Sequence, residues 1–184
     1  MVGVGRRRNE VESRGPRPRD RAALAIAALT IVLLPQSAPA PARAQRPDIE
    51  LKGITVVGVV VEDLSSQAVQ CGLNRESIQG SASKVLADAG LKVVRDSDDD
   101  TYVYLNVMTT GIPGGICVSR YDAYLYTHTT AKLSYQDTPV LIQVSLIHEG
   151  GLAGGAAATH GEHVAASLRQ YVEQFAMRIR RANQ

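Results

Sequence analysis

The stretch from Thr101 to Glu149 constrains the fold of this chain more than any other part of its sequence. Apolar residues alternate there with tyrosines and polar residues in three runs: Thr101–Thr109, Arg120–Tyr135 and Val140–His148. Alternation with a period of two, rich in β-branched and aromatic residues, predicts β-strands. The segments between the runs, Gly111–Gly115 and Gln136–Pro139, have the composition of turns. The stretch therefore predicts three consecutive antiparallel strands.

The register of these strands follows from placing their apolar side chains on one face of the sheet. The expected pairs of the first hairpin are Val103–Leu125, Tyr102–Tyr126 and Tyr104–Tyr124, and those of the second are Leu133–Ile142 and Ala131–Val144. The opposite face then carries four tyrosines and a histidine: Tyr102, Tyr104, Tyr124, Tyr126 and His128. A sheet with one apolar face needs a second layer, so helices must cover that face.

The flanking segments supply the remaining elements. A β-branched run at Ile54–Val61 and a short run at Leu91–Val94 predict two strands. Between them, Asn74 is a suitable N-cap for a helix that ends near Gly90. An apolar stripe predicts a last helix from about Glu162 to Arg181. The predicted fold is a two-layer α+β sandwich in the order β-α-β-β-β-β-α, with a largely antiparallel sheet and both helices on one face.

Residues 1–44 have the pattern of a cleavable secretory signal peptide. Seven arginines precede the apolar run Ala22–Leu34, and Ala42-Arg43-Ala44 offers a small-x-small cleavage site. A run of thirteen residues is too short to span a bilayer, which takes about 20. The alternatives are an uncleaved anchor or a disordered basic arm. The pattern predicts a periplasmic or secreted protein with no integral membrane segment after cleavage.

Residues 45–184 are predicted to form a single domain. Residues 1–44 hold eight of the 20 basic and three of the 18 acidic side chains, which leaves the remainder with a net charge of −3. A mildly acidic domain lacks the positive surface that nucleic-acid binding requires, so we expect no nucleic-acid partner.

The chain contains two cysteines, Cys71 and Cys117. An even number of cysteines in an exported domain favours a disulfide, since that compartment is oxidising. Two separate free thiols are the alternative.

Two other segments have suggestive compositions. Asp96–Asp100 begins like a calcium-binding loop, but Thr101 and Val107 stand where glycine and glutamate are needed, which favours a solvated turn. Gly150–Gly155 has the composition of a phosphate loop without its Lys-Ser/Thr, which favours a flexible link between the last strand and the last helix.

The function that these features favour is binding without catalysis. Tyrosines on an open sheet face, Tyr102, Tyr104, Tyr124 and Tyr126 with His128, would contact a protein or another component of the cell envelope. The same rings could instead serve only cross-strand packing. No nucleophile signature or cofactor motif is present in the sequence, so we expect no cofactor.

Two alternatives remain. His148, His160 and His163 could hold a metal ion, which would make the chain a metal-binding protein or a metal-dependent enzyme. Pairing between edge strands could make it a homo-oligomer.

Overall fold

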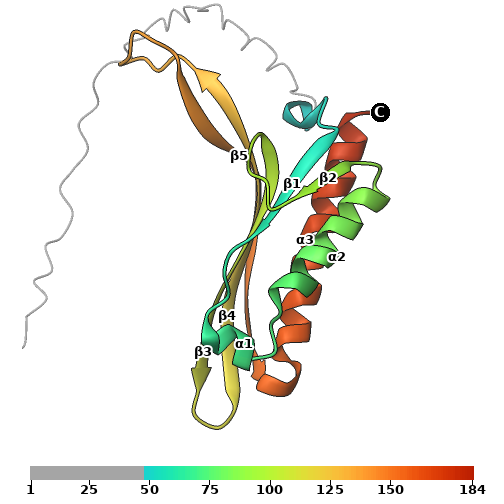
Figure 1. The fold of residues 1–184 in the computed structure, drawn as a ribbon, viewed down its shortest axis with the longest axis vertical. Coiled ribbons are helices and arrows are strands. Elements are labelled where there is room, and N and C mark those ends of the chain that lie inside the picture. Colours follow the sequence, from blue (N-terminus) through green and yellow to red (C-terminus); the bar gives the residue numbers. More distant parts are fainter. Residues whose placement is uncertain (1–47) are drawn as a thin grey trace, which may run out of the picture. The chain divides into compact units, whose positions relative to one another are not determined.

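The computed structural model describes residues 48–184, and Figure 1 shows how their elements are arranged. The predicted signal peptide, residues 1–44, lies outside the described residues. The elements in chain order are η1 (Ile49–Leu51), β1 (Val56–Val61), α1 (Ser66–Gln70), α2 (Arg75–Asp88), β2 (Lys92–Arg95), β3 (Thr101–Ile112), β4 (Ile116–Ala131), β5 (Val140–Ala156) and α3 (Ala157–Ala182).

The five strands form one sheet in the order β2-β1-β3-β4-β5. β1 runs parallel to both β2 and β3, whereas β3, β4 and β5 form an antiparallel meander. The helices α2 and α3 cover one face of the sheet, here called the inner face, and no helix within residues 48–184 covers the opposite, outer face (Figure 1). The predicted two-layer α+β sandwich is confirmed. β5 lies at one edge of this sheet, where the predicted pairing with a second copy would occur.

The core lies between the inner face and the helices. It is aliphatic apart from Tyr121 and the only phenylalanine of the chain, Phe175, which is completely buried in α3. The largest fully buried side chains that the strands contribute to this core are those of Val57, Val59, Val61, Val103, Leu105 and Leu125. Because side chains alternate along a strand, burying these residues sends their neighbours to the outer face.

The first hairpin of the meander has the predicted register. Val103 pairs with Leu125, Tyr102 with Tyr126 and Tyr104 with Tyr124. The predicted N-cap is also confirmed, since the Asn74 side chain accepts a hydrogen bond from Ser77 N at 2.8 Å. Local patterns were sufficient in both places because no irregularity interrupts them.

The predicted register of the second hairpin is wrong. Ala131 pairs with Val140 rather than Val144, and Ile142 pairs with Thr129 rather than Leu133, which lies beyond the end of β4. The difference arises at the turn, because residues 132–139 form the connection where only Gln136–Pro139 was predicted. Further along the hairpin, a β-bulge shifts the pairing of β5 between Leu125 and Tyr126 of β4. The bulge lets Ile147 turn to the inner face, where it is buried. An irregularity of this kind leaves no mark in a pattern of alternating residues.

The glycine-rich segment Gly150–Gly155 is not the predicted flexible link but the last part of β5. A Cβ at Gly150 would lie 2.5 Å from Asp122 Oδ1, and one at Gly151 would lie 2.8 Å from Tyr121 Oη. These glycines therefore make room for large side chains of β4 on both faces of the sheet. The last helix follows directly and begins at Ala157 rather than near Glu162.

The connection after β1 contains a short helix, α1, that the sequence analysis did not predict. The Ser65 side chain caps it by accepting a hydrogen bond from Ala68 N at 3.2 Å. Directly after α1, Cys71 is joined to Cys117 of β4, which confirms the predicted disulfide. Gly72 and Gly161 then bring α1 and the start of α3 into backbone contact, because a Cβ at Gly161 would overlap the Gly72 carbonyl.

The turn between β2 and β3 folds back over β1. The Asp96 carboxylate accepts hydrogen bonds from Gln79 at 2.8 Å and from Arg75 at 2.9 Å, so this end of the predicted solvated turn is anchored to α2. The Ser97 carbonyl oxygen then lies directly over Gly58, where it would overlap with any Cβ. Gly58 is thus required for the turn to reach the outer face.

Substituting Gly58 tests this close approach. We expect Gly58→Ala to lower the free energy of unfolding by about 1–3 kcal/mol, since the clash is with backbone that cannot rotate away. Urea denaturation measures the change. Gly111→Ala, also in a strand but with nothing within 4 Å of its Cβ position, is the matched control and should change stability by less than about 0.5 kcal/mol. Equal stability of the two variants would contradict the placement of the turn.

Candidate functional site

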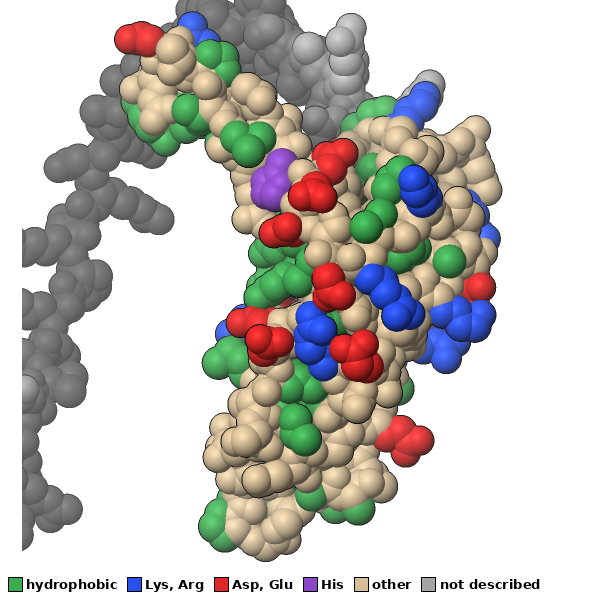
Figure 2. All heavy atoms as spheres, in the orientation of Figure 1, with side chains coloured by type: hydrophobic (Ala, Val, Ile, Leu, Met, Phe, Trp, Pro, Cys, Tyr) green, Lys and Arg blue, Asp and Glu red, His purple; other side chains and the backbone are tan. Residues whose placement is uncertain are grey.

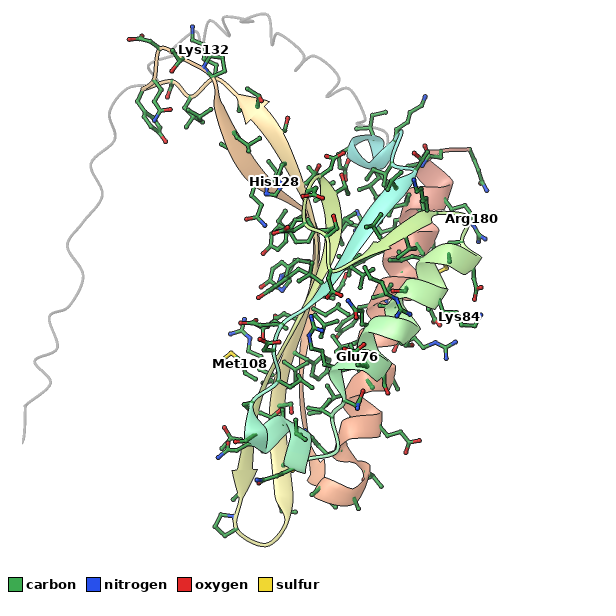
Figure 3. All side chains as sticks on the ribbon, in the orientation of Figure 1. Glu76, Lys84, Met108, His128, Lys132 and Arg180 are labelled. Carbon is green, nitrogen blue, oxygen red and sulfur yellow. A yellow bond between two sulfur atoms is a disulfide. The ribbon has the colours of Figure 1, made fainter. Side chains whose placement is uncertain are left out.

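The outer face of β3, β4 and β5 carries a continuous group of aromatic side chains. We call it the tyrosine face and define it by six residues: Tyr102, Tyr104, Tyr124, Tyr126, His128 and His148. Five of these were predicted to share one face, and His148 joins them from β5. Figure 3 shows the aromatic side chains projecting from the side of the sheet opposite the helices, with His128 labelled among them.

Each ring of this face contacts a ring on the same or a neighbouring strand, so that the contacts run across the sheet. His148 stacks on Tyr124 with ring centroids 4.2 Å apart, and Tyr124 stacks on Tyr126 at 5.0 Å. Tyr104 lies tilted beside both tyrosines, at 6.4 and 6.2 Å. Aromatic pairs at such separations attract one another through dispersion and their quadrupoles. The face is therefore a connected surface with fixed ring positions.

Tyr102 completes the group at the β1 side. Its ring lies 5.7 Å from that of Tyr126 and 5.9 Å from that of His128. Only 6 % of Tyr102 is exposed, and Gln143 of β5 donates a hydrogen bond to its hydroxyl. Tyr104, Tyr124 and Tyr126 are half-buried. Tyr102 is therefore the buried member of the face, and the other three tyrosines remain partly accessible to solvent.

Burial and a neighbouring carboxylate hold the hydroxyl of Tyr104 in its neutral form. The hydroxyl donates a 2.6 Å hydrogen bond to Glu62, which follows β1. Burial first, and then the Glu62 carboxylate, raises the pKa of Tyr104 to about 12. Burial also raises the pKa of Tyr126 and of Tyr102. These groups act as neutral hydrogen-bonding partners at physiological pH.

An aspartate at the margin of the tyrosine face was missed by the sequence analysis. Asp122 is 7 % exposed, and its two carboxylate oxygens lie 3.1 Å from His148 Nε2 and 3.0 Å from Arg120 Nε. Asp122 thereby orients His148 for stacking on Tyr124. The position of Asp122, two residues before Tyr124 in the same strand, places both side chains on one face and was the signal that could have indicated it.

The structure separates the three histidines of the predicted metal site. His148 lies on the outer face, whereas His160 is buried at the start of α3 on the inner side and His163 is exposed one turn further along. Within residues 48–184, no group of three or more His, Cys, Asp or Glu side chains is arranged to hold a metal ion. The interpretation as a metal site therefore has no geometric basis in this part of the chain.

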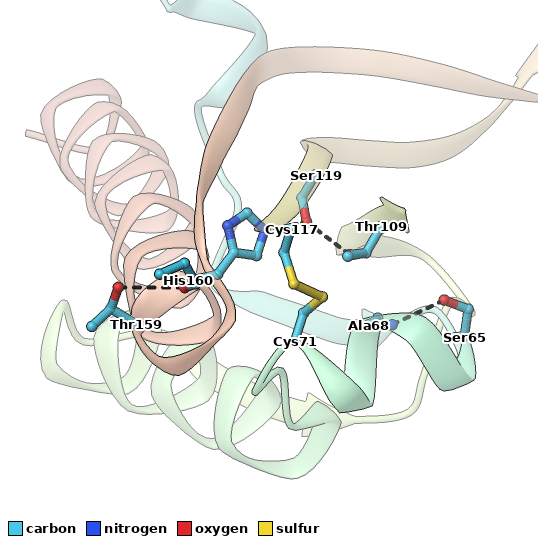
Figure 4. Close-up of a disulfide and its surroundings, with 9 residues drawn as sticks. Ser65, Ala68, Cys71, Thr109, Cys117, Ser119, Thr159 and His160 are labelled. Carbon is cyan, nitrogen blue, oxygen red and sulfur yellow. Dashed lines mark hydrogen bonds between the residues drawn. A yellow bond between two sulfur atoms is a disulfide. The ribbon is translucent and has the colours of Figure 1, made fainter. Parts of the chain in front are cut away.

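His160 instead belongs to a buried hydrogen-bonded cluster beside the disulfide (Figure 4). Its Nε2 lies 2.7 Å from Ser119 Oγ, which in turn lies 2.7 Å from Thr109 Oγ1. Ser119 is completely buried and His160 is 2 % exposed, so a substrate could not reach this serine–histidine pair. The cluster links the start of α3 to β3 and β4. Burial first, and then the charge of His163, lowers the pKa of His160.

The comparisons with known proteins do not place this chain in a family. No family model matches the chain, and no curated protein matches it. Among solved structures, the chain resembles a PelC dodecamer from Paraburkholderia phytofirmans, with 15% identity, 70% of this chain and 87% of that chain covered, and a TM-score of 0.37. It also resembles a putative neuraminyllactose-binding hemagglutinin homolog from Helicobacter pylori, with 12% identity, 71% and 86% coverage, and a TM-score of 0.21. With TM-scores this low, neither resemblance bears on function.

The Tyr104–Glu62 hydrogen bond predicts a dependence of stability on alkaline pH. Because the folded-state pKa of Tyr104 is raised from 10.0 to about 12, its stabilising contribution is complete below pH 10 and is lost as the pH rises toward 12. Urea unfolding between about pH 9 and pH 11 measures this loss. We expect Glu62→Gln to reduce the loss, and Glu173→Gln, in α3 on the other side of the sheet, to leave it as in wild type. A loss of equal size in Glu62→Gln would refute the coupling.

His160 predicts a second dependence, at acidic pH. Its lowered folded-state pKa means that the unfolded chain binds a proton more readily, so stability is complete above pH 6.5 and falls as the pH drops below that value. We expect His160→Gln to be less stable at neutral pH, because it disturbs the buried cluster, but to show a flatter dependence between pH 7.5 and 5.5. His128→Gln, on the opposite face, serves as the control and should keep the wild-type slope.

Proposed function

We propose that this chain is an exported, non-enzymatic binding protein, periplasmic or secreted, that contacts a partner through the tyrosine face. The observation that carries the proposal is the continuous ring array on a sheet face that no helix within residues 48–184 covers. Its partner is a protein or another component of the cell envelope.

The chemistry of the face suits recognition. Tyrosine brings a large, rigid contact area at low entropic cost, and its hydroxyl offers a hydrogen bond at the tip. Here Tyr124 and Tyr126 are already held parallel at 5.0 Å, and His148 extends the stack. Because these side chains are already ordered, little side-chain entropy is lost on binding, which favours affinity.

The polar groups beside the rings support binding rather than acid–base chemistry. A general acid or base at neutral pH needs a pKa near 7. Tyr104 has a pKa of about 12, and both oxygens of Asp122 are already engaged by Arg120 and His148. These residues are suited to orienting a ligand through hydrogen bonds. They are not suited to general acid–base catalysis.

Two further observations support export. The Cys71–Cys117 disulfide is stable in an oxidising compartment such as the periplasm or the extracellular space. Residues 1–44 have the pattern of a signal peptide. Among residues 48–184, no helix is both long enough and apolar enough to cross a membrane.

Capture from a fractionated envelope extract tests the proposal. We expect immobilised wild type to retain a component that the double variant Tyr104→Ala/Tyr124→Ala does not retain, because the double variant removes the centre of the ring array. Cross-strand aromatic pairs contribute only about 0.2–1 kcal/mol each, so the variant should still fold, as urea denaturation can verify.

Tyr135→Ala is the matched control for this experiment. Tyr135 lies in the loop between β4 and β5 and is 79% exposed, so it resembles the lost rings in chemistry but lies outside the face. The control should retain the same component as wild type. Equal retention by the double variant would show that the tyrosines serve packing alone.

A further inference from the structure

Three uncharged segments converge at one end of the described residues, 48–184. They are residues 64–74, 107–119 and 150–161, and none contains Lys, Arg, Asp or Glu. We call them together the uncharged end. Since charged residues make up 21% of the chain, their absence from three separate segments that converge in space is a distinct feature of this region.

The structure joins these segments firmly. The disulfide ties Cys71 to Cys117, and Cys117 pairs with Gly155 across β4 and β5. The backbones of Gly72 and Gly161 are in contact. Figure 1 shows the β3–β4 turn, α1 and the start of α3 together at this end of the described residues, at the bottom of the view.

The tip of the uncharged end exposes aliphatic side chains. Ile112 and Ile116 flank the turn between β3 and β4 and are 47% and 42% exposed, and Pro113 between them is exposed as well. Further exposed apolar residues continue from the tip over neighbouring surface: Val69, Met108, Val118 and Leu152. The lowest part of Figure 2 shows green and tan side chains and no blue or red ones, and Figure 3 places Met108 on the outer face above the turn.

Part of the backbone at this tip is paired within the protein. β3 and β4 pair as far as Ile112 and Ile116, and Ala157 N donates to the carbonyl of Gly115 at 2.9 Å. Backbone groups paired in this way lose little on leaving water, whereas the outer edges of β3 and β5 at this end are not paired with another strand of residues 48–184, which restricts the contact to the hydrated interface of a bilayer. His160, the only titratable side chain in the three segments apart from the bridged cysteines, is buried, and its burial favours the neutral form.

We propose that the uncharged end is a membrane-contact site, with the β3–β4 turn inserting into the interface of a lipid bilayer. The tip is a projecting turn, which fits a deformable lipid surface better than the rigid surface of another protein. Absence of charge is what a bilayer requires, because each charged side chain carried into it is costly. The charged residues that border the three segments limit the depth of entry: Asp63, Arg75, Arg120, Glu149 and Glu162.

The attraction is hydrophobic rather than electrostatic. Apolar side chains that enter the boundary between headgroups and acyl chains gain free energy with the area that they bury. Residues 45–184 have a net charge of −3, so they have no net electrostatic attraction to anionic lipids. We therefore expect binding to electrically neutral phosphatidylcholine, with little dependence on salt.

The absence of tryptophan from the chain gives this proposal a local test. Ile116→Trp places a single fluorophore at the tip in the full chain, and Leu141→Trp places one at another exposed aliphatic position, 73% exposed, in β5. With phosphatidylcholine vesicles, we expect the emission of Ile116→Trp to move to shorter wavelength and to be quenched by brominated acyl chains. The emission of Leu141→Trp should change in neither way.

A second substitution at the tip completes the test. Adding Ile112→Asp to the Ile116→Trp variant should weaken vesicle binding at least about tenfold, since it puts a charge into the inserting turn. Ile112→Ser, which is uncharged, should weaken it less and serves if the aspartate variant does not fold. Because the signal comes from residue 116 alone, binding by the N-terminal segment does not produce it.

Three results would overturn the proposal. They are no quenching of the Ile116→Trp variant, equal quenching of the Leu141→Trp variant, or a wavelength shift that depends on protein concentration without vesicles. The last would identify the tip as a contact between copies of the chain. This site is separate from the tyrosine face, so either proposal can fail alone.

Discussion

Burial of the aliphatic inner face of the sheet under α2 and α3 is the interaction on which the rest of the structure depends. Val103 and Leu105 are completely buried against a core that includes Phe175. Once these residues face inward, the pleat of the strand sends Tyr102 and Tyr104 outward. The core thus positions the tyrosine face, although no tyrosine of that face belongs to the core itself.

The proposed contact surfaces divide the outer side of the meander between two chemistries. Near the middle of β4, aromatic rings, Asp122 and Arg120 offer shape, hydrogen bonds and charge. Toward the β3–β4 turn, aliphatic side chains and glycines replace them, and charge disappears. Because β3, β4 and β5 run through both regions, a protein held at its tip would present its rings along the side of the same rigid sheet, clear of the lipid surface.

The sequence predicted those parts of the structure in which a regular pattern continues without interruption. The register of Tyr102, Tyr104, Tyr124 and Tyr126 followed from simple alternation, and the cap at Asn74 from local chemistry. The predicted β5 register failed because β4 ends at Ala131, which makes the connection to β5 longer than the predicted turn. The β-strand at Gly150 was missed because only the packing of Asp122 and Tyr121 explains its glycines. The Asp122–His148 contact joins residues from different strands beyond the β-bulge, so no local pattern could indicate it.

β1 joins two kinds of strand arrangement within the one sheet. β1, α2 and β2 make one unit of local contacts, and β3, β4 and β5 make another. The junction between them, here called the seam, is the short parallel ladder that pairs β1 with β3, from Gly58–Tyr102 to Val61–Leu105. The paired residues lie far apart in the chain. Non-local pairing of this kind is slow, because the loop must close before any contact forms. Cys71 and Cys117 lie on opposite sides of the seam, so the disulfide adds a covalent link to a junction that otherwise consists of one short ladder and side-chain packing.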